Sequence, residues 1–317
     1  MCGICGEMRF DGDKPNQSKM LNMMDSIAKR GPDHRDEYRH GNIYLGHRRL
    51  SVIDISSKSN QPMMDAKSGR VIVFNGVIYN YKELRELLKK KGYRFSSDGD
   101  TEVILKSYDY YGRDCVKYLD GVFSFCIYDL ERKDFFLARD RLGIKPLYYK
   151  INNEYFSFSS NTRALTRKDD NIISHQSLHY QFTLHSVVPA PNTIFENLYK
   201  LEPGHSMIIN HKGEVSKDKY YSFNDIKINS NISENEILEE SERLLLKAIE
   251  KRFYTADVNV GVLLSGGLDS SLIVAMAAEN KLSKVNTFSI GFPTISDEVG
   301  VEFYYSGPLV NFSITKP

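Results

Sequence analysis

MCGICG, residues 1–6, places a cysteine directly behind the initiator methionine and a small glycine after it. Because these two residues are small, we expect Met1 to be removed, which would leave Cys2 as the first residue. Its thiol would then lie beside a free α-amine with a reference pKa of about 7.7–8. One residue would thus supply both the nucleophile and its general base. The stretch therefore predicts an N-terminal nucleophile at the start of a strand within residues 1–12.

The same cysteines have two plainer interpretations. A free cysteine is more often a small buried apolar residue, here at the start of a strand. The spacing Cys2-x-x-Cys5 also occurs in redox and zinc sites, but the sequence has no second CxxC and no HxxxH partner. A metal site at these cysteines is therefore not expected. The choice between nucleophile and buried cysteine stays open on this stretch alone.

Length, charge and cysteine content limit the class of protein. A chain of 317 residues exceeds the usual size of one domain and favours two. With 42 basic and 41 acidic residues, it has no electrostatic footprint for nucleic acid or an anionic membrane. No apolar run reaches the ~20 residues that span a bilayer, and the first residues lack the layout of a signal peptide. Four cysteines are too few for a disulfide scaffold, so we expect a cytoplasmic protein.

Residues 1 to about 165 combine short strand-like runs with a few helical segments. Apolar residues at 20, 21, 23, 24 and 27 have helical spacing, and Ser18 is the expected N-cap of a helix over 18–30. Several strand-like runs are apolar on both faces, as in sheets covered on both sides. This region predicts a strand-rich α+β domain. Two more helices are expected at 81–91 and 101–111, and strands at 42–54, 70–80, 121–130, 134–140, 146–151 and 154–160.

The pattern changes after a turn-rich region at 166–225 and a polar stretch at 222–236. A helix, a strand that we expect to be buried, a second helix and a second strand then follow at 234–253, 258–264, 271–280 and 285–292. That order is the beginning of a βαβ unit with parallel strands. The sequence therefore predicts a first domain at 1–220, a linker at 221–233 and a second domain at 234–317.

Polar residues in the first region fit a site for an amide substrate. An acyl-enzyme reaction needs an oxyanion hole, and Asn75 with Gly76 offers a side-chain amide and a glycine N–H at a strand end. Arg49 offers a bidentate fork for a carboxylate, and Asp100 offers an anion for an ammonium group. Each has a plainer alternative: a hairpin turn for Asn-Gly, a surface charge or ion pair for Arg49, and a helix N-cap for Asp100. These residues alone leave the alternatives open.

LLSGGLDSSLIVAMA, residues 263–277, joins the strand and the helix expected in the second region. Its glycines let backbone N–H groups approach a ligand, and a helix N-terminus favours a phosphate. Ser265, Ser270 and Ser271 add hydroxyl donors, and Asp269 can orient the loop or hold Mg²⁺. The stretch is not a Walker A loop, because no GxxxxGK[ST] is present. A plain strand–helix turn capped by serine is the alternative, and we expect phosphate binding.

Several motifs occur in the order and spacing of one family, which the chain resembles over roughly residues 1–292. They are MCGICG, RGPD at 30–33, HRRLSVID, NGVIYN, DTEVIL, LDGVFSFCIYD and ARDRLGIKPLYY. The set resembles the class II glutamine amidotransferases and, with SGGLDSS behind it, the glutamine-hydrolysing asparagine synthetases. The resemblance implies an α+β N-terminal-nucleophile αββα sandwich. It also implies that the start of an α/β adenine-nucleotide alpha-hydrolase-like (ATP pyrophosphatase) domain follows.

By this resemblance the first domain is a glutaminase. Cys2 would attack the side-chain amide of glutamine, giving a γ-glutamyl thioester and ammonia, and Asn75 and Gly76 would form the oxyanion hole. Arg49 would hold the α-carboxylate of the substrate and Asp100 its α-amine. The backbone lining of the pocket would come from Leu50, Ser51, Val52 and Ile53.

By the same resemblance the second domain uses ATP to activate aspartate. Ammonia from the first site would cross to the second site and attack β-aspartyl-AMP, yielding asparagine. Adenine would rest near the backbone of Leu264 and Ile290, and Asp269 is the candidate ligand of Mg²⁺. The pyrophosphate loop would consist of Ser265, Gly266, Gly267, Asp269 and Ser270.

The chain departs from the family pattern at three places. Val77 replaces the glutamate of NGEIYN that helps bind the substrate amine, which removes a charge-assisted hydrogen bond worth about 1.5–3 kcal/mol. We expect glutamine affinity to fall roughly 10- to 100-fold, without loss of the nucleophile. Asn161 stands where the family usually carries an acidic residue, with no clear consequence. After Phe292 the resemblance fades, so we expect a truncated or frameshifted product in which adenylation is absent or severely impaired.

Three functional interpretations remain. The first is a glutamine-dependent asparagine synthetase with an incomplete synthetase half, acting on glutamine, aspartate and ATP. The second is a related amidotransferase with another acceptor, which SGGLDSS disfavours. The third is a glutaminase-only or non-catalytic binding module, which Val77 and the divergent end favour. We expect no nucleic-acid or membrane partner, and the oligomeric state stays open with a homodimer as the candidate.

Overall fold

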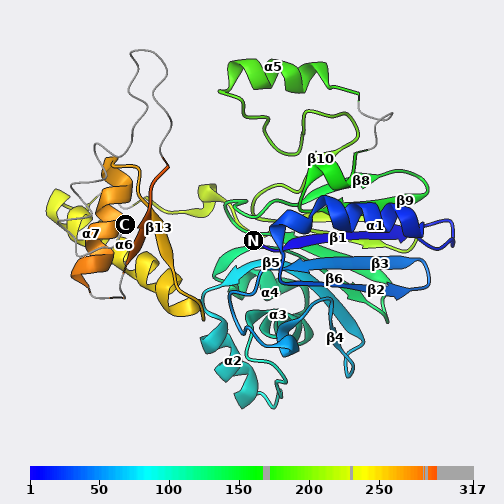
Figure 1. Cartoon of the computed structure of the whole chain (residues 1–317), viewed down its shortest axis with the longest axis horizontal. Coiled ribbons are helices and arrows are strands. Elements are labelled where there is room, and N and C mark those ends of the chain that lie inside the picture. The colour runs from blue at the N-terminus through cyan, green and yellow to red at the C-terminus, as the bar shows by residue number, and fades with distance from the viewer. Residues whose placement is uncertain (167–171, 229–230, 281, 283–284, 291–317) are drawn as a thin grey trace. The chain divides into compact units, whose positions relative to one another are not determined.

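A computed structural model describes residues 1–166, 172–228, 231–280, 282 and 285–290. The chain divides into two compact units, Met1–Lys227 and Ile228–Pro317 (Figure 1). The division falls between residues 227 and 228, and the linker at 221–233 stays a prediction. Within the described ranges, no helix is both long and apolar enough to cross a membrane.

The first sheet of unit 1 is built around β1 (Gly3–Arg9), which pairs antiparallel with a neighbour on each side. Gly3 lies opposite Arg48, so Cys2, just ahead of the strand, is placed beside the end of β3. The strand order is β10-β8-β9-β1-β3-β2. The other strands are β2 (His34–His40), β3 (Ile43–Arg49), β8 (Tyr148–Ile151), β9 (Tyr155–Ser159) and β10 (Tyr199–Lys200).

The second sheet of unit 1 is centred on β5 (Arg70–Ile78), which pairs with β6 along its whole length. Along β5, Val71 and Val73 point into a core shared with the first sheet, while Ile72 and Phe74 point to the opposite face. The strand order is β12-β11-β7-β6-β5-β4. The other strands are β4 (Met63–Asp65), β6 (Gly121–Asp129), β7 (Asp134–Arg139), β11 (His205–Asn210) and β12 (Val215–Lys219).

Helices cover the outer face of each sheet. Helix α1 (Gln17–Ser26) buries Met20, Met23 and Met24 against Cys5 and Tyr44 of the first sheet. Helices α2 (Tyr81–Lys90), α3 (Asp100–Tyr111) and α4 (Cys115–Tyr118) pack on the outer face of the second sheet. The layers are therefore helix, sheet, sheet, helix, which confirms the predicted αββα sandwich (Figure 1).

Two helix starts in unit 1 differ from the prediction. Helix α1 has Asn16, not Ser18, as its N-cap, because the Asn16 side chain accepts a hydrogen bond from the backbone N–H of Lys19. Helix α3 has Gly99 as its N-cap and Asp100 as its first residue, so the N-cap interpretation of Asp100 is wrong. The turn-rich region also contains α5 (His175–Thr183), which the sequence pattern did not indicate.

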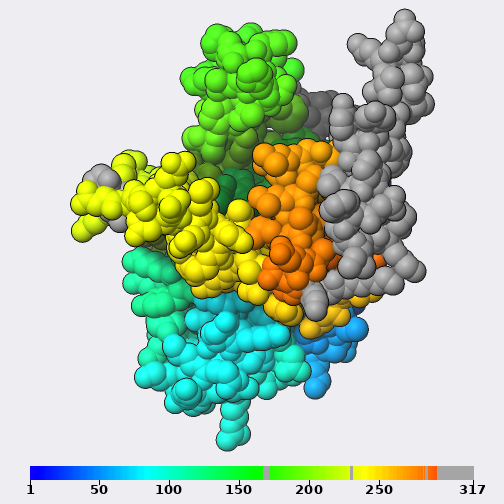
Figure 2. Space-filling model, turned by 90° about the vertical axis from the view of Figure 1, so that its left-hand side faces the viewer, coloured from blue at the N-terminus to red at the C-terminus, as the bar shows by residue number. Residues whose placement is uncertain are grey.

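Unit 2 consists of α6 (Glu234–Thr255), β13 (Gly261–Leu263), α7 (Leu268–Glu279) and β14 (Asn286–Phe288). Helix α6 begins with a capping box between Ser233 and Glu236. Strands β13 and β14 are parallel, as predicted, and α6 packs beside α7 (yellow and orange in Figure 2). Strand β13 was predicted to be buried, which is wrong, because Leu263 at its end is 72% exposed.

Candidate functional site

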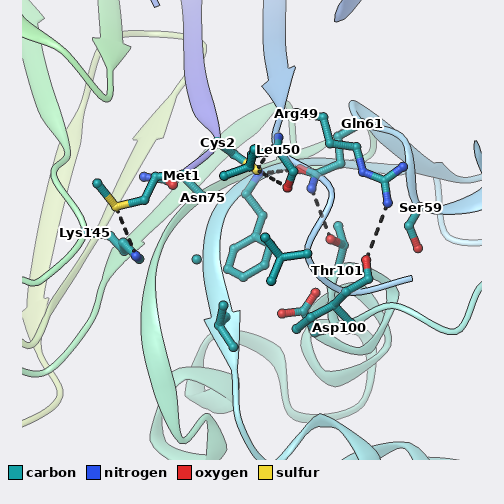
Figure 3. Close-up of a pocket in the computed structure, with 15 residues that line it drawn as sticks. Met1, Cys2, Arg49, Leu50, Ser59, Gln61, Asn75, Asp100, Thr101 and Lys145 are labelled. Carbon is teal, nitrogen blue, oxygen red and sulfur yellow. Dashed lines mark hydrogen bonds between the residues drawn. The ribbon is translucent and has the colours of Figure 1, made fainter. Parts of the chain in front are cut away.

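A pocket of about 260 Å³ lies where elements of both sheets end near the start of α3 (Figure 3). Cys2 precedes β1, Arg49 ends β3, Asn75 lies near the end of β5 and Asp100 begins α3. All the residues predicted for the glutamine site line this pocket except Ser51, whose backbone N–H donates to Asp33 Oδ2 at 2.7 Å. Residues from four separate segments thus meet in one cavity.

Cys2 is held by the chain that follows β3. The backbone N–H of Leu50 donates to Cys2 Sγ at 3.4 Å, and Arg30 Nε donates to the Cys2 carbonyl oxygen at 2.9 Å. Burial raises the pKa of the Cys2 thiol, an effect that the Leu50 hydrogen bond partly offsets. Because a thiol with a raised pKa stays protonated near neutral pH, attack by Cys2 requires a nearby base. Burial also lowers the pKa of the α-amine of Met1, the terminal amine while Met1 is attached.

Asn75 and Gly76 lie inside β5 and pair with Ser124 and Phe123 of β6. A hairpin turn at Asn-Gly is therefore wrong. Asn75 is fully buried, yet neither its Oδ1 nor its Nδ2 has a hydrogen-bond partner among the described residues. A Cβ at position 76 would collide with the carbonyl oxygen of Val122, so this position requires glycine. A buried amide without a partner, lining a pocket, is free to bind a ligand oxygen.

Arg49 is buried and makes hydrogen bonds to protein oxygens. Its Nη1 donates to the Ser56 carbonyl and to Asn60 Oδ1, each at 2.7 Å. Its Nη2 donates to the carbonyls of Ile53, at 3.5 Å, and Asp54. The surface-charge interpretation is wrong, because the residue is only 4% exposed. The guanidinium shapes the wall of the pocket in this structure.

Asp100 carries the carboxylate nearest to the end of β5. Its Oδ2 accepts a hydrogen bond from the backbone N–H of Ile78 at 3.0 Å, and burial raises its pKa to about 6. Val77, which precedes Ile78, lines the same pocket. The wall beside Asp100 is therefore apolar where the family pattern has a second carboxylate.

The serine- and glycine-rich loop of unit 2 joins β13 to the N-terminus of α7. Ser265 and Ser270 hydroxyls lie 3.1 Å apart, and the Ser271 hydroxyl donates to the Gly267 carbonyl at 2.7 Å. Gly266 has φ of +84°, a conformation that favours glycine. Gly267 is the N-cap of α7 without a side-chain hydrogen bond. The first turn of α7 thus has free N–H groups for an anion.

Three other residues predicted for the nucleotide site of unit 2 differ in how exposed they are to solvent. Leu264 is buried. Its backbone N–H donates a hydrogen bond to the Phe288 carbonyl, and its own carbonyl oxygen accepts one from the Ser289 hydroxyl at 2.6 Å. Ile290 is 60% exposed, and Asp269 is exposed in the first turn of α7. No group of three His, Cys, Asp or Glu side chains in the described part of the chain could hold a metal. A lone carboxylate here fits only a Mg²⁺ that is bound mainly by nucleotide phosphates.

Residues 1–221, which contain the whole pocket, match the family described as "Glutamine amidotransferase domain". The chain belongs to this glutamine amidotransferase family. Residues 240–304 match a second family, described as "Asparagine synthase". The amidotransferase domain therefore contains the Cys2 pocket, and the second match contains the loop before α7.

Curated relatives are similar to most of this chain. The putative glutamine-hydrolysing asparagine synthetase 2 of Methanocaldococcus jannaschii is 38% identical over 94% of this chain and 61% of its own length. The glutamine-hydrolysing asparagine synthetase 1 of Bacillus subtilis is 35% identical over 92% of this chain and 46% of its own length. An amidase, chry2, of Gibberella zeae is 32% identical over 88% of this chain and 43% of its own length. The chain thus spans about half the length of these relatives.

Solved structures support the fold of the amidotransferase domain. The glutamine phosphoribosylpyrophosphate amidotransferase of B. subtilis, complexed with ADP and GMP, has a TM-score of 0.50 at 16% identity. It covers 91% of this chain and 65% of its own. An allosteric regulatory enzyme of purine biosynthesis gives the same TM-score and identity. At this identity the likeness concerns the fold alone.

Six lining residues of the amidotransferase pocket, Met1 among them, were not among the predicted site residues. Phe74 precedes Asn75, and Lys145 Nζ lies 3.2 Å from Met1 Sδ. Lys145 is part of the quoted motif ARDRLGIKPLYY, so the sequence held a signal for it, although without a role. Thr101 lies in the quoted motif DTEVIL, also without a role, whereas Ser59 and Gln61 gave no sequence signal, because single polar residues between strands are usually solvated.

Proposed function

We propose that the first unit hydrolyses glutamine, with Cys2 as nucleophile after removal of Met1. The Cys2 thiol would pass its proton to its own α-amine and attack the side-chain carbon of glutamine. The resulting tetrahedral oxyanion would collapse to a γ-glutamyl thioester as ammonia leaves with the proton. Water would then attack the thioester, releasing glutamate and restoring the thiol.

The unpaired amide of Asn75 carries this proposal. A buried amide without hydrogen-bond partners lowers the free energy of unfolding, so its presence in the pocket wall supports a role in binding a ligand. Asn75 Nδ2 and the backbone N–H of Gly76 would stabilise the oxyanion, and each such donor is worth about 3 kcal/mol to catalysis. Burial of the Cys2 thiol, which raises its pKa, supports the need for a base beside the nucleophile.

The remaining pocket residues would recognise the amino-acid end of glutamine. Ionised Asp100 would bind the ammonium group, with Leu50, Val52 and Ile53 lining the pocket. Arg49 would bind the α-carboxylate by giving up its longest hydrogen bond, the 3.5 Å contact to the Ile53 carbonyl. Val77 contributes no charge, so we propose a weakened affinity for glutamine.

We propose that the second unit binds ATP through the loop of Ser265, Gly266, Gly267, Asp269 and Ser270. The free N–H groups at the start of α7 support a pyrophosphate site, with adenine near Leu264 and Ile290. Asp269 would hold Mg²⁺, which would neutralise phosphate charge. Aspartate would be adenylated with release of pyrophosphate, and ammonia would displace AMP to give asparagine. A cytoplasmic location and a homodimer accompany this proposal as expectations.

Ammonia release separates the glutaminase from the synthetase proposal. Purified protein with glutamine alone should release ammonia and glutamate in equal amounts, and Cys2→Ala should abolish the release. Addition of aspartate and ATP tests the second unit through asparagine and pyrophosphate formation. Ammonia without asparagine would leave a glutaminase, and no ammonia from wild type would refute the enzyme proposal.

A further inference from the structure

A short segment between β3 and β4, residues 56–61, makes hydrogen bonds to Arg49 and to the residues next to Asn75 and Asp100. The Ser56 carbonyl and the Asn60 side chain accept hydrogen bonds from Arg49 Nη1. Gln61 is 4% exposed and reaches two other elements. The segment is therefore joined to β3, β5 and α3 at once.

Gln61 links the strand of Asn75 to the helix of Asp100. Its Oε1 accepts a hydrogen bond from the backbone N–H of Phe74 at 2.6 Å, one residue before Asn75. Its Nε2 donates to Thr101 Oγ1 at 3.1 Å, one residue after Asp100. Figure 3 shows the Gln61 side chain pointing to Thr101 across the pocket wall. One side chain thus bonds the backbone beside Asn75 and the side chain beside Asp100, two groups proposed to bind the same substrate molecule.

The backbone of Phe74 is fixed from the other side as well. Its carbonyl oxygen lies 3.1 Å from His47 Nε2, and His47 is fully buried on β3 two residues before Arg49. Burial lowers the pKa of His47 to about 3, so the ring is neutral and Nε2–H is the donor. Phe74 is therefore held between β3 and Gln61.

We propose that Gln61 is a positioning residue of the glutaminase site, which sets the separation between the oxyanion donor Asn75 and the ammonium acceptor Asp100. The proposal rests on the proposed glutaminase function. The side chain of glutamine limits the distance between its side-chain amide and its α-amine, so both ends bind in a reactive geometry only over a narrow range of separations. An error of about 1 Å in such a geometry can cost on the order of 100-fold in rate.

Steady-state glutaminase kinetics of four variants test the role. Gln61→Met keeps the length of the side chain but removes both hydrogen bonds, so kcat should fall about tenfold or more and KM should rise. Thr101→Val removes only the link to α3, so KM should rise roughly 5- to 10-fold with kcat within about twofold. Thr101→Ser restores the hydroxyl and should restore KM. Gln176→Met, at an exposed glutamine on α5, is the matched control and should behave as wild type.

The outcomes separate this role from the function on which it rests. Wild-type kcat and KM in a folded Gln61→Met variant would overturn the proposal. If Gln61→Met does not unfold cooperatively, the Thr101 pair decides, and equal KM values for Thr101→Val and Thr101→Ser would overturn it. Wild-type protein that releases no ammonia from glutamine would refute the glutaminase itself, and the role of Gln61 with it.

Discussion

The carboxylate of Asp100 accepts a hydrogen bond from the backbone N–H of Ile78, which ties the first residue of α3 to the end of β5. The residue between this contact and the Asn75–Gly76 pair is Val77, which lines the same pocket. The proposed amine-binding wall and the proposed oxyanion donors thus lie two to three residues apart on one strand. Substitutions along this strand separate substrate binding from catalysis.

Val77→Glu should strengthen glutamine binding. The new carboxylate would lie in the pocket with Asp100 and would add a charge-assisted hydrogen bond to the substrate ammonium. We expect KM for glutamine to fall about 10- to 100-fold, measured from initial rates of ammonia release. Val77→Gln has the same length without the charge and should lower KM by less than about tenfold. An unchanged KM in Val77→Glu, or an equal gain in Val77→Gln, would contradict the missing-carboxylate explanation.

The pH dependence of kcat/KM should report Asp100. Its pKa of about 6 means that it loses its charge, and its hold on an ammonium group, as the pH falls below 6. The α-amine base, with a reference pKa of about 7.7–8, is already protonated below pH 6, so log kcat/KM should fall with a slope near two there. In Asp100→Asn one of the two titrating groups is gone, and the slope should be near one. Equal slopes in wild type and Asp100→Asn would show that Asp100 is not one of the groups that titrate in the pH profile.

Asp100 should also make folding pH-dependent. Burial raises its pKa from 3.8 to about 6, so the folded state binds a proton that the unfolded state does not between these values. The contribution to stability is present below pH 4 and is lost as the pH rises through 6, by roughly 3 kcal/mol. Asp100→Asn should therefore raise the free energy of unfolding at pH 7 and much less at pH 4. Urea titrations of wild type and Asp100→Asn at both pH values check this. A lower free energy of unfolding for Asp100→Asn at pH 7 would contradict the expected sign.

The amide of Asn75 should matter for catalysis and not for folding. Because Oδ1 and Nδ2 have no hydrogen-bond partner among the described residues, Asn75→Leu breaks no bond in the folded state. The free energy of unfolding should be unchanged or higher, while kcat should fall about 10²- to 10³-fold. Asn22→Leu on the exposed side of α1 controls for the change of side chain. A kcat within tenfold of wild type would remove Asn75 from the oxyanion hole.

The sequence predicted the parts of the fold and site that depend on ordered motifs. The αββα sandwich was predicted from motifs that occur in the order typical of one family. The pocket brings Cys2, Arg49, Asn75 and Asp100 together. Local patterns were less reliable. Ser18 looked like a helix cap, but Asn16 supplies the side-chain oxygen that reaches the backbone N–H three residues later. Both residues are good caps, so propensity could not choose between them.

Contacts between distant segments could not be predicted from the sequence. Gln61 bonds a strand residue 13 positions away and a helix residue 40 positions away, and such links leave no periodic pattern. Arg49 has the positive charge that could bind a carboxylate, yet its N–H groups donate hydrogen bonds to backbone carbonyls in the turn after β3. The exposure of Leu263 was also missed, because an apolar run indicates a strand without indicating what covers it.

Mass spectrometry of the N-terminal peptide, after treatment with a diazoketone analogue of glutamine, tests the central claim most directly. We predict a peptide that begins at Cys2 and carries one equivalent of the label on this residue, and that excess glutamine protects it from labelling. Retention of Met1, or an unlabelled Cys2 in folded protein, would contradict an N-terminal cysteine nucleophile.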